Sequence, residues 1–164
     1  MLFTIGHSNH TLKGFFDILH NNAIEYVVDI RSAPYSRYVP HFNKADIAAS
    51  LEADGYRYLY MGDLLGGLPQ DKSLYSGDGL VDYDRLATTA SFQKGLDRVA
   101  KGINKGFRIS LMCAEENPQK CHRHLLIAKE FEERRKIQVS HLRADGTIVL
   151  AKALPFVSKQ LQIF

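Results

Sequence analysis

Residues 107–124 read FRISLMCAEENPQKCHRH, and this stretch contains both cysteines of the chain, Cys113 and Cys121. Its first part, FRISLMC, is an apolar run that ends in a thiol, a pattern typical of a strand buried on both faces. The pair Asn117–Pro118 indicates a helix start, because proline suits the first helical position. We therefore predict a buried strand, a polar loop and a helix, the repeating unit of a parallel sheet.

The same alternation of strand and helix runs along the rest of the chain. The predicted strands are LFTIG (2–6), EYVVDIR (25–31), RYLYM (57–61), FRISLMC (107–113), IQVSHL (137–142) and a short final strand, TIVLA (147–151). Helices are predicted after Thr11, from Asn43 to an end at Gly55, from about Asp82 to Asn104, and from Pro118 to about Arg135. A long glycine-rich loop spans 61–79. The pattern predicts an α/β fold: a three-layer sandwich with a mostly parallel, about five-stranded sheet, doubly wound and Rossmann-like or flavodoxin-like.

Length, composition and charge restrict the class of protein. The 164 residues, 45% hydrophobic and 24% charged, predict a single domain over 1–164, with a weakly patterned tail at 152–164. No apolar run is long enough to cross a membrane, and the start does not resemble a signal peptide. Two cysteines eight positions apart predict a reduced, cytoplasmic protein rather than a disulfide framework. The net charge of +3 permits an anionic partner, and nucleic acid remains possible. The oligomeric state is not indicated.

Polar side chains follow four of the predicted strands. They are His7 and Ser8 after the first, Asp29, Arg31, Ser36 and Arg37 after the second, Gly66 and Gly67 after the third, and Cys113, Glu115, His122 and Arg123 after the fourth. In an open parallel sheet, ligands bind beyond the carboxyl ends of the strands. We therefore predict a pocket at this edge of the sheet, with Asn43 among its ligand-binding residues.

Several of these motifs, taken in order, resemble a known family. TIGHS, VDIR with its proline–serine loop and FN, then LGG, LMCAE and CHR together resemble the bacterial domain-of-unknown-function family 488, from about Thr4 to His141. The resemblance implies no particular activity. It implies that most of the residues named above, together with Pro34, Phe42 and Cys121, fall on signature positions. Asn9–His10 departs from the small polar pair usual there, which points to a different ligand preference at that wall.

The two cysteines each have more than one interpretation. Cys113, at a strand end before a helix, is either a nucleophile with a lowered pKa or a buried apolar thiol. Cys121 is predicted to pack in the core, in register with Leu125, and a redox pair with Cys113 is the alternative. The ligand types of Cys113, Cys121, His122 and His124 fit zinc. However, Cys121 and His122 are neighbours on the predicted helix, where adjacent side chains diverge by about 100°. We therefore expect no metal and no cofactor.

The remaining candidates divide between chemistry and binding. Catalytic roles are predicted for His7, Asp29, Cys113 and Glu115, with His7 or Asp29 moving a proton. Arg31 and Arg123 are predicted to bind an anion, although Arg31 could instead form a structural pair with Asp29. Gly66 and Gly67 would let the backbone pass close to a ligand.

Three functions are compatible with these features. The first is an enzyme acting on a small anionic or nucleotide-like substrate in the pocket. The second is a nucleic-acid-associated module of repair or defence, with the aromatic and basic loop around Arg37 in contact with phosphates and bases. The third is a non-catalytic ligand sensor. The convergence of polar strand ends favours the enzyme.

Overall fold

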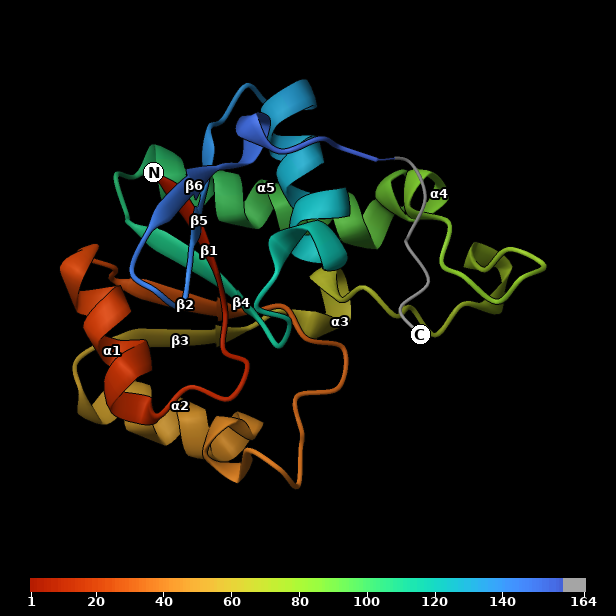
Figure 1. Cartoon of the computed structure of the whole chain (residues 1–164). Coiled ribbons are helices and arrows are strands. Elements are labelled where there is room, and N and C mark those ends of the chain that lie inside the picture. The colour runs from red at the N-terminus through yellow and green to blue at the C-terminus, as the bar shows by residue number, and fades with distance from the viewer. Residues whose placement is uncertain (158–164) are drawn as a thin grey trace.

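The computed structural model describes residues 1–157 and contains a six-stranded sheet between two layers of helices (Figure 1). The strands are β1 (Leu2–Gly6), β2 (Tyr26–Asp29), β3 (Arg57–Tyr60), β4 (Ile109–Cys113), β5 (Val139–Leu142) and β6 (Ile148–Leu150). Their order in the sheet is β3-β2-β4-β1-β5-β6. All neighbours are parallel except β5 and β6. The predicted α/β sandwich with a mostly parallel sheet is confirmed.

Helices cover both faces of this sheet. They are α1 (Leu12–Asn21), α2 (Lys44–Ala53), α3 (Gly62–Leu65), α4 (Tyr83–Ala87) and α5 (Ala90–Asn104), with the π-helical segments η4 (Arg123–Ala128) and η5 (Glu130–Arg134). The layer of α1 and α2 packs on one face, and α5 with η4 and η5 packs on the other (Figure 1).

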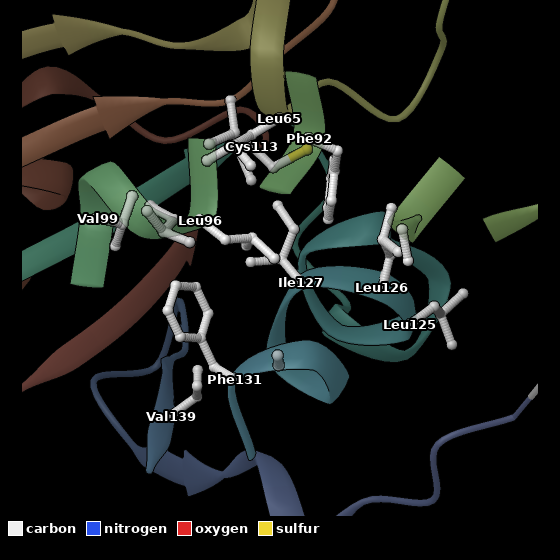
Figure 2. Packing of buried hydrophobic residues seen from close by; sticks show 14 of the residues in the cluster. Leu65, Phe92, Leu96, Val99, Cys113, Leu125, Leu126, Ile127, Phe131 and Val139 are labelled. Carbon is white, nitrogen blue, oxygen red and sulfur yellow. The ribbon is translucent and has the colours of Figure 1, made fainter. Parts of the chain in front are cut away.

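The four central strands, β2, β4, β1 and β5, are mostly apolar because both of their faces are buried. In β4, Leu111 belongs to the cluster under α5, and its neighbour Met112 belongs to the cluster under α1 and α2. Figure 2 shows the first of these clusters, in which the Cys113 side chain lies close to Leu65 and Phe92. Successive residues of a strand point to opposite faces, so a two-sided core requires a continuous apolar run.

The predicted helix ends are mostly confirmed. The hydroxyl of Thr11 accepts a hydrogen bond from the Gly14 N–H at 3.1 Å and caps α1. Gly55 follows α2 with a φ of +89°, the left-handed conformation common after a helix. Asn43 precedes α2 as predicted, but its side chain does not cap the helix. Its Oδ1 instead accepts from the Ser36 N–H at 2.7 Å.

Two predicted segments are more broken than expected. The single helix predicted over 82–104 is two helices, because α4 ends at its C-cap Thr88 and Thr89 caps α5 by accepting from Phe92 N–H. The loop at 61–79 contains α3 and a 3₁₀ turn, η2 (Lys72–Leu74). Local side-chain caps therefore divide segments that apolar spacing alone joins.

The helix predicted from Pro118 to Arg135 is also wrong in its first turns. Asn117 and Pro118 start only a 3₁₀ turn, η3 (Pro118–Lys120). Cys121 follows in an extended conformation, with φ −131° and ψ 143°, and π-helical geometry begins at Arg123. Cys121 therefore lies in a linker between helical segments, and its side chain is not bound to helical spacing.

Part of the C-terminal tail packs against the domain. A 3₁₀ turn, η6 (Ala151–Ala153), follows β6, and the Phe156 ring stacks on His124 at 4.7 Å between centroids. The rest of the tail prediction, over 158–164, lies outside the described residues. Within residues 1–157, no helix is both long and apolar enough to cross a membrane.

Candidate functional site

The carboxyl ends of the central strands lie at one edge of the sheet, as predicted. Gly6 is in register with Cys113, and Asp29 is in register with Met112. The backbone continues this alignment beyond the strands, because the His7 N–H donates to the Cys113 carbonyl at 2.9 Å. The first residues after β1, β2 and β4 are therefore direct neighbours.

Asp29, Arg31 and His7 form one buried cluster at this edge. The Asp29 carboxylate accepts from Arg31 Nε at 2.8 Å and from Arg31 Nη2 at 2.7 Å, a bidentate pair. Arg31 Nη1 lies 3.0 Å from His7 Nε2. Tyr58 also donates its hydroxyl to Asp29, at 2.7 Å. Asp29 thus holds Arg31 in one orientation, which is the structural pairing considered from the sequence.

His7 is held as a neutral ring. Its Nδ1 lies 2.9 Å from the Ser8 carbonyl, which requires the proton on Nδ1 and leaves Nε2 to accept from Arg31. Burial is the largest influence and lowers the pKa of His7 to about 4. Ser8 adopts a φ of 42°, unusual for a residue other than glycine. Both ring nitrogens of His7 therefore have protein partners, and Nε2 accepts from Arg31.

A pocket of about 270 Å³ opens beside this cluster, and we name it the thiol pocket. Its lining comes from the loops after β2 and β4, from the segment after α3, and from α4. The lining residues are Arg31, Ser32, Ala33, Gly67, Leu68, Tyr83, Cys113, Ala114, Glu115, Lys120, Cys121 and His122. The structure therefore brings together Arg31, Gly67, Cys113, Glu115 and His122 of the predicted site.

Cys113, Cys121 and His122 form a tight group in this lining, the thiol–imidazole cluster. The His122 Nδ1 lies 3.8 Å from the Cys113 Sγ and 3.7 Å from the Cys121 Sγ. The other ring nitrogen, Nε2, lies 3.1 Å from the Leu65 carbonyl and must carry the proton that it donates there. The lone pair of Nδ1 is therefore directed toward the two sulfur atoms.

The two thiols have opposite electrostatic environments. A hydrogen bond from Cys121 lowers the pKa of Cys113 well below its usual value, aided by His122 and Arg123 and opposed by burial. Burial, followed by the neighbouring Cys113, raises the pKa of Cys121. Cys113 is the more acidic thiol of the pair. It also packs in the hydrophobic cluster of Figure 2, so it is at once a core residue and a pocket residue.

Gly67 allows the His122 ring to reach this position. A Cβ atom at Gly67 would lie 2.7 Å from Cγ of His122, closer than real contacts allow. A Cβ at Gly66 would lie 2.2 Å from the Ser32 hydroxyl. The predicted close approach at the two glycines is therefore present, but the approaching groups are protein side chains.

Arg123 has a structural place in the fold rather than the predicted place in the pocket. Its side chain is fully buried, with Nη1 donating to the Thr4 hydroxyl at 2.7 Å. Its Nη2 donates to the carbonyls of Glu115 and Glu116, and so fixes the loop after β4. Within residues 1–157 its Nε has no hydrogen-bond partner. The guanidinium is not available to an anion in the thiol pocket.

A second group of histidines continues from Arg123, and we name Thr4, Arg123, His124 and His141 the sealed histidine network. The Thr4 hydroxyl lies 2.7 Å from His141 Nδ1, and His141 Nε2 lies 3.0 Å from His124 Nδ1. His124 Nε2 lies 3.1 Å from the Pro155 carbonyl. One consistent set of donors, from Arg123 to the Pro155 carbonyl, satisfies both rings in their neutral form.

Other predicted ligand residues lie outside the pocket lining. The Ser36 hydroxyl accepts from the Tyr38 N–H at 3.1 Å, and Asn43 accepts from Ser36, so both shape the loop after β2. Arg37 is exposed, donates to the Tyr38 hydroxyl at 2.6 Å and lies over its ring. These side chains were expected at the site because they follow β2, but the loop directs them into its own contacts.

Sequence reasoning missed Lys120 and Tyr83 and placed Cys121 in the core only. Lys120 ends the 3₁₀ turn before Cys121 and supplies a cation to the thiol pocket. Tyr83 begins α4, and burial raises its pKa. Lys120 could have been identified from the sequence, because it directly precedes the thiol of Cys121. No local signal identifies the second, because Tyr83 reaches the pocket only through the fold.

Together, the sheet and its edge define an α/β protein with a cysteine- and histidine-lined pocket beyond the carboxyl ends of its strands. The family model "Domain of unknown function DUF488" matches residues 11–129, and the chain belongs to this family. The match includes the thiol–imidazole cluster and Arg31 but leaves out His7 and Ser8. Neither a curated protein nor a solved structure matches the chain.

Proposed function

We propose that this protein is an enzyme that acts on a small anionic substrate in the thiol pocket. The observation that carries the proposal is that Arg31 and Lys120 line the same pocket as Cys113 and His122. Positive charge and a reactive group then face a single ligand. Glu115 is the one acid in this lining, and its Oε1 accepts from the Asn117 N–H at 2.9 Å.

Arg31 supports anion binding through its fixed geometry. Three of the five N–H groups that a guanidinium carries bond to Asp29 and His7. Among residues 1–157, no partner accounts for the remaining two. An arginine held in this way loses little conformational entropy on binding, which favours a bidentate anion. Asp29 and His7 are thus proposed as positioning residues for Arg31.

The size of the pocket sets the substrate class. A volume of about 270 Å³ is at the small end for ligand sites. A hollow of about 500 Å³ adjoins it and shares Ser32 and Leu68 with its lining. The pair suits a substrate whose anionic group enters the thiol pocket and whose remainder extends along the loop after α3.

Charge-selective alkylation tests the proposal. In reducing, chelating buffer, iodoacetate and iodoacetamide present the same electrophile with and without a negative charge. We expect the iodoacetate-to-iodoacetamide rate ratio at Cys113 to exceed that of glutathione by about tenfold, the effect of one modest charge–charge attraction. Lys120→Gln should lower the ratio, whereas the matched surface change Lys94→Gln on α5 should leave it unchanged.

The catalytic part of the proposal needs turnover. A panel of small phosphorylated and carboxylated compounds would be incubated with the wild type and with Cys113→Ser, and consumption followed by mass spectrometry. Consumption by the wild type that is lost in Cys113→Ser supports the enzyme. A ratio equal to that of glutathione would contradict the anion pocket, and tight binding with no consumption would replace the enzyme by a sensor.

The nucleic-acid alternative rests on a different surface. Tyr35 and Tyr38 are 76% and 78% exposed, beside Arg37 on the loop after β2. Exposed aromatic rings with an arginine suit stacking on unpaired bases. A salt-sensitive gel shift with single-stranded DNA that is lost in a Tyr35→Ala, Tyr38→Ala double variant, and kept in Cys113→Ser, would favour this alternative.

A further inference from the structure

The thiol–imidazole cluster has the composition and spacing of a metal site. Its three potential ligand atoms, Cys113 Sγ, Cys121 Sγ and His122 Nδ1, all lie within 4.8 Å of one another. The two sulfur-to-nitrogen distances are 3.8 and 3.7 Å. Zinc bonds of about 2.3 Å to sulfur and about 2.0 Å to nitrogen, at tetrahedral angles, place those atoms about 3.5 Å apart. The ligands are therefore nearly in position before any ion is added.

The protonation of His122 fits the same purpose. Ligating histidines usually donate their second ring N–H to a carbonyl or carboxylate, which fixes the tautomer and orients the ring. His122 Nε2 donates to the Leu65 carbonyl at 3.1 Å, so Nδ1 carries the free lone pair. Gly67 lies against the same side chain, where a Cβ atom would come within 2.7 Å of the His122 Cγ and 2.9 Å of its Nδ1. Both contacts hold Nδ1 toward the sulfurs.

The conformation of Cys121 removes the objection raised from the sequence. Adjacent side chains on a helix diverge, but Cys121 is extended and His122 begins the helical geometry. The change in backbone conformation between them turns both side chains to one side. Each of the three residues is less than one-tenth exposed, so the sulfurs have little competing water.

We propose that Cys113, Cys121 and His122 bind a Zn²⁺ ion, with a fourth coordination position open to the thiol pocket. Two thiolates and a neutral imidazole form a ligand set that binds zinc in preference to harder cations. The open position follows from the lining, since all three ligands border the pocket and supply only three donor atoms. An ion there would polarise a bound anion or lower the pKa of a bound water.

The test uses the full-length chain under a thiol-free reductant. Zinc content is measured by mass spectrometry after dialysis, and Co²⁺ replaces Zn²⁺ as a spectroscopic probe. For the wild type we expect about one zinc per chain and, with Co²⁺ bound in place of Zn²⁺, a thiolate-to-cobalt charge-transfer band. Cys113→Ser, Cys121→Ser and His122→Asn should each weaken binding more than tenfold. His20→Asn, a surface change at the end of α1, is the matched control and should have no effect.

Each contrary result has a defined meaning. No retained zinc and no charge-transfer band in the wild type would overturn the site, and so would metal binding that survives all three ligand substitutions. Azide probes the open position: it should shift the cobalt spectrum, and no shift would show a closed, four-ligand site. The inference extends the proposed function without depending on it. Turnover that is lost in Cys113→Ser, by a wild type that retains no zinc and shows no charge-transfer band, would refute only the metal site, whereas a metal-loaded protein with no turnover would refute only the enzyme.

Discussion

The segment from Cys121 to His124 contributes to two buried clusters that differ in the hydrogen bonding of their histidines. In the sealed histidine network, both nitrogens of His124 and of His141 have a partner within hydrogen-bonding distance. In the thiol–imidazole cluster, the Nδ1 of His122 faces two sulfur atoms at 3.7 and 3.8 Å, and thiols are weak hydrogen-bond partners.

The two clusters differ in how many of their side-chain atoms could still bind an additional group. None of the residues of the sealed network lines the thiol pocket, and the network ends on the Pro155 carbonyl. The thiol–imidazole cluster borders a pocket and retains three donor atoms for an additional group. Two histidines two positions apart therefore differ: both ring nitrogens of His124 have partners within the fold, whereas Nδ1 of His122 faces only the two thiols.

The largest expected effect is at Arg123. Arg123→Met removes the donor of a buried hydrogen bond to Thr4 and of two part-buried hydrogen bonds to loop carbonyls. We expect the free energy of unfolding to fall by about 3–5 kcal/mol, the usual cost of breaking a buried charged network. His122→Asn should cost clearly less, because its ring makes one strong bond. Urea denaturation of both variants makes the comparison, and equal losses would show that the two clusters do not differ in this way.

The next effect is on the pH dependence of stability. Burial lowers the pKa of His141 to about 2, and that of His7 to about 4, from the ordinary 6.5. Between pH 6.5 and 4 the unfolded chain therefore binds protons that the folded chain refuses, and stability falls as the pH falls. Each such histidine contributes at most about 1.4 kcal/mol per pH unit. Urea midpoints from pH 7 to pH 5 measure the slope, and a flat profile would contradict the prediction.

The smallest effect on stability is expected at Gly67, where a substitution should nevertheless disturb the site. A methyl group there would push the His122 ring from its position, while the ring has the pocket to move into. We expect Gly67→Ala to change the free energy of unfolding by about 1 kcal/mol or less and to lower the cobalt affinity measurably. Gly77→Ala is the control, because its Cβ would meet no atom within 4 Å. Unchanged cobalt binding in Gly67→Ala would separate this glycine from the site.

Much of the architecture could be predicted because it follows from apolar periodicity and strong caps. The two-sided apolar strands indicated a covered parallel sheet, and Thr11 and Gly55 marked helix ends by local chemistry. The edge that carries the site followed from the rule for parallel sheets. The order of the strands did not, because it depends on which distant segments pair, and nothing local encodes that choice.

Individual side chains were harder to place. Arg123 follows His122 directly and carries the charge expected of an anion ligand, yet it reaches Thr4, which lies 119 positions away in the sequence. Cys121 was expected on a helix, and only its extended backbone brings it beside His122. In both cases the deciding quantity is a backbone conformation or a tertiary contact that residue type alone does not specify.

The central position of β1 has a consequence for synthesis of the chain. β1 is made first but pairs with β4 on one side and β5 on the other, starting with Leu2 against Ile109 and Val139. Both of its hydrogen-bonding edges stay unsatisfied while more than a hundred residues are translated, roughly 5–20 s at ordinary ribosomal rates. Through that interval an apolar strand with two open edges is exposed to other chains. The nascent protein is therefore expected to depend on ribosome-associated chaperones, and slower translation beyond residue 113 would prolong that dependence.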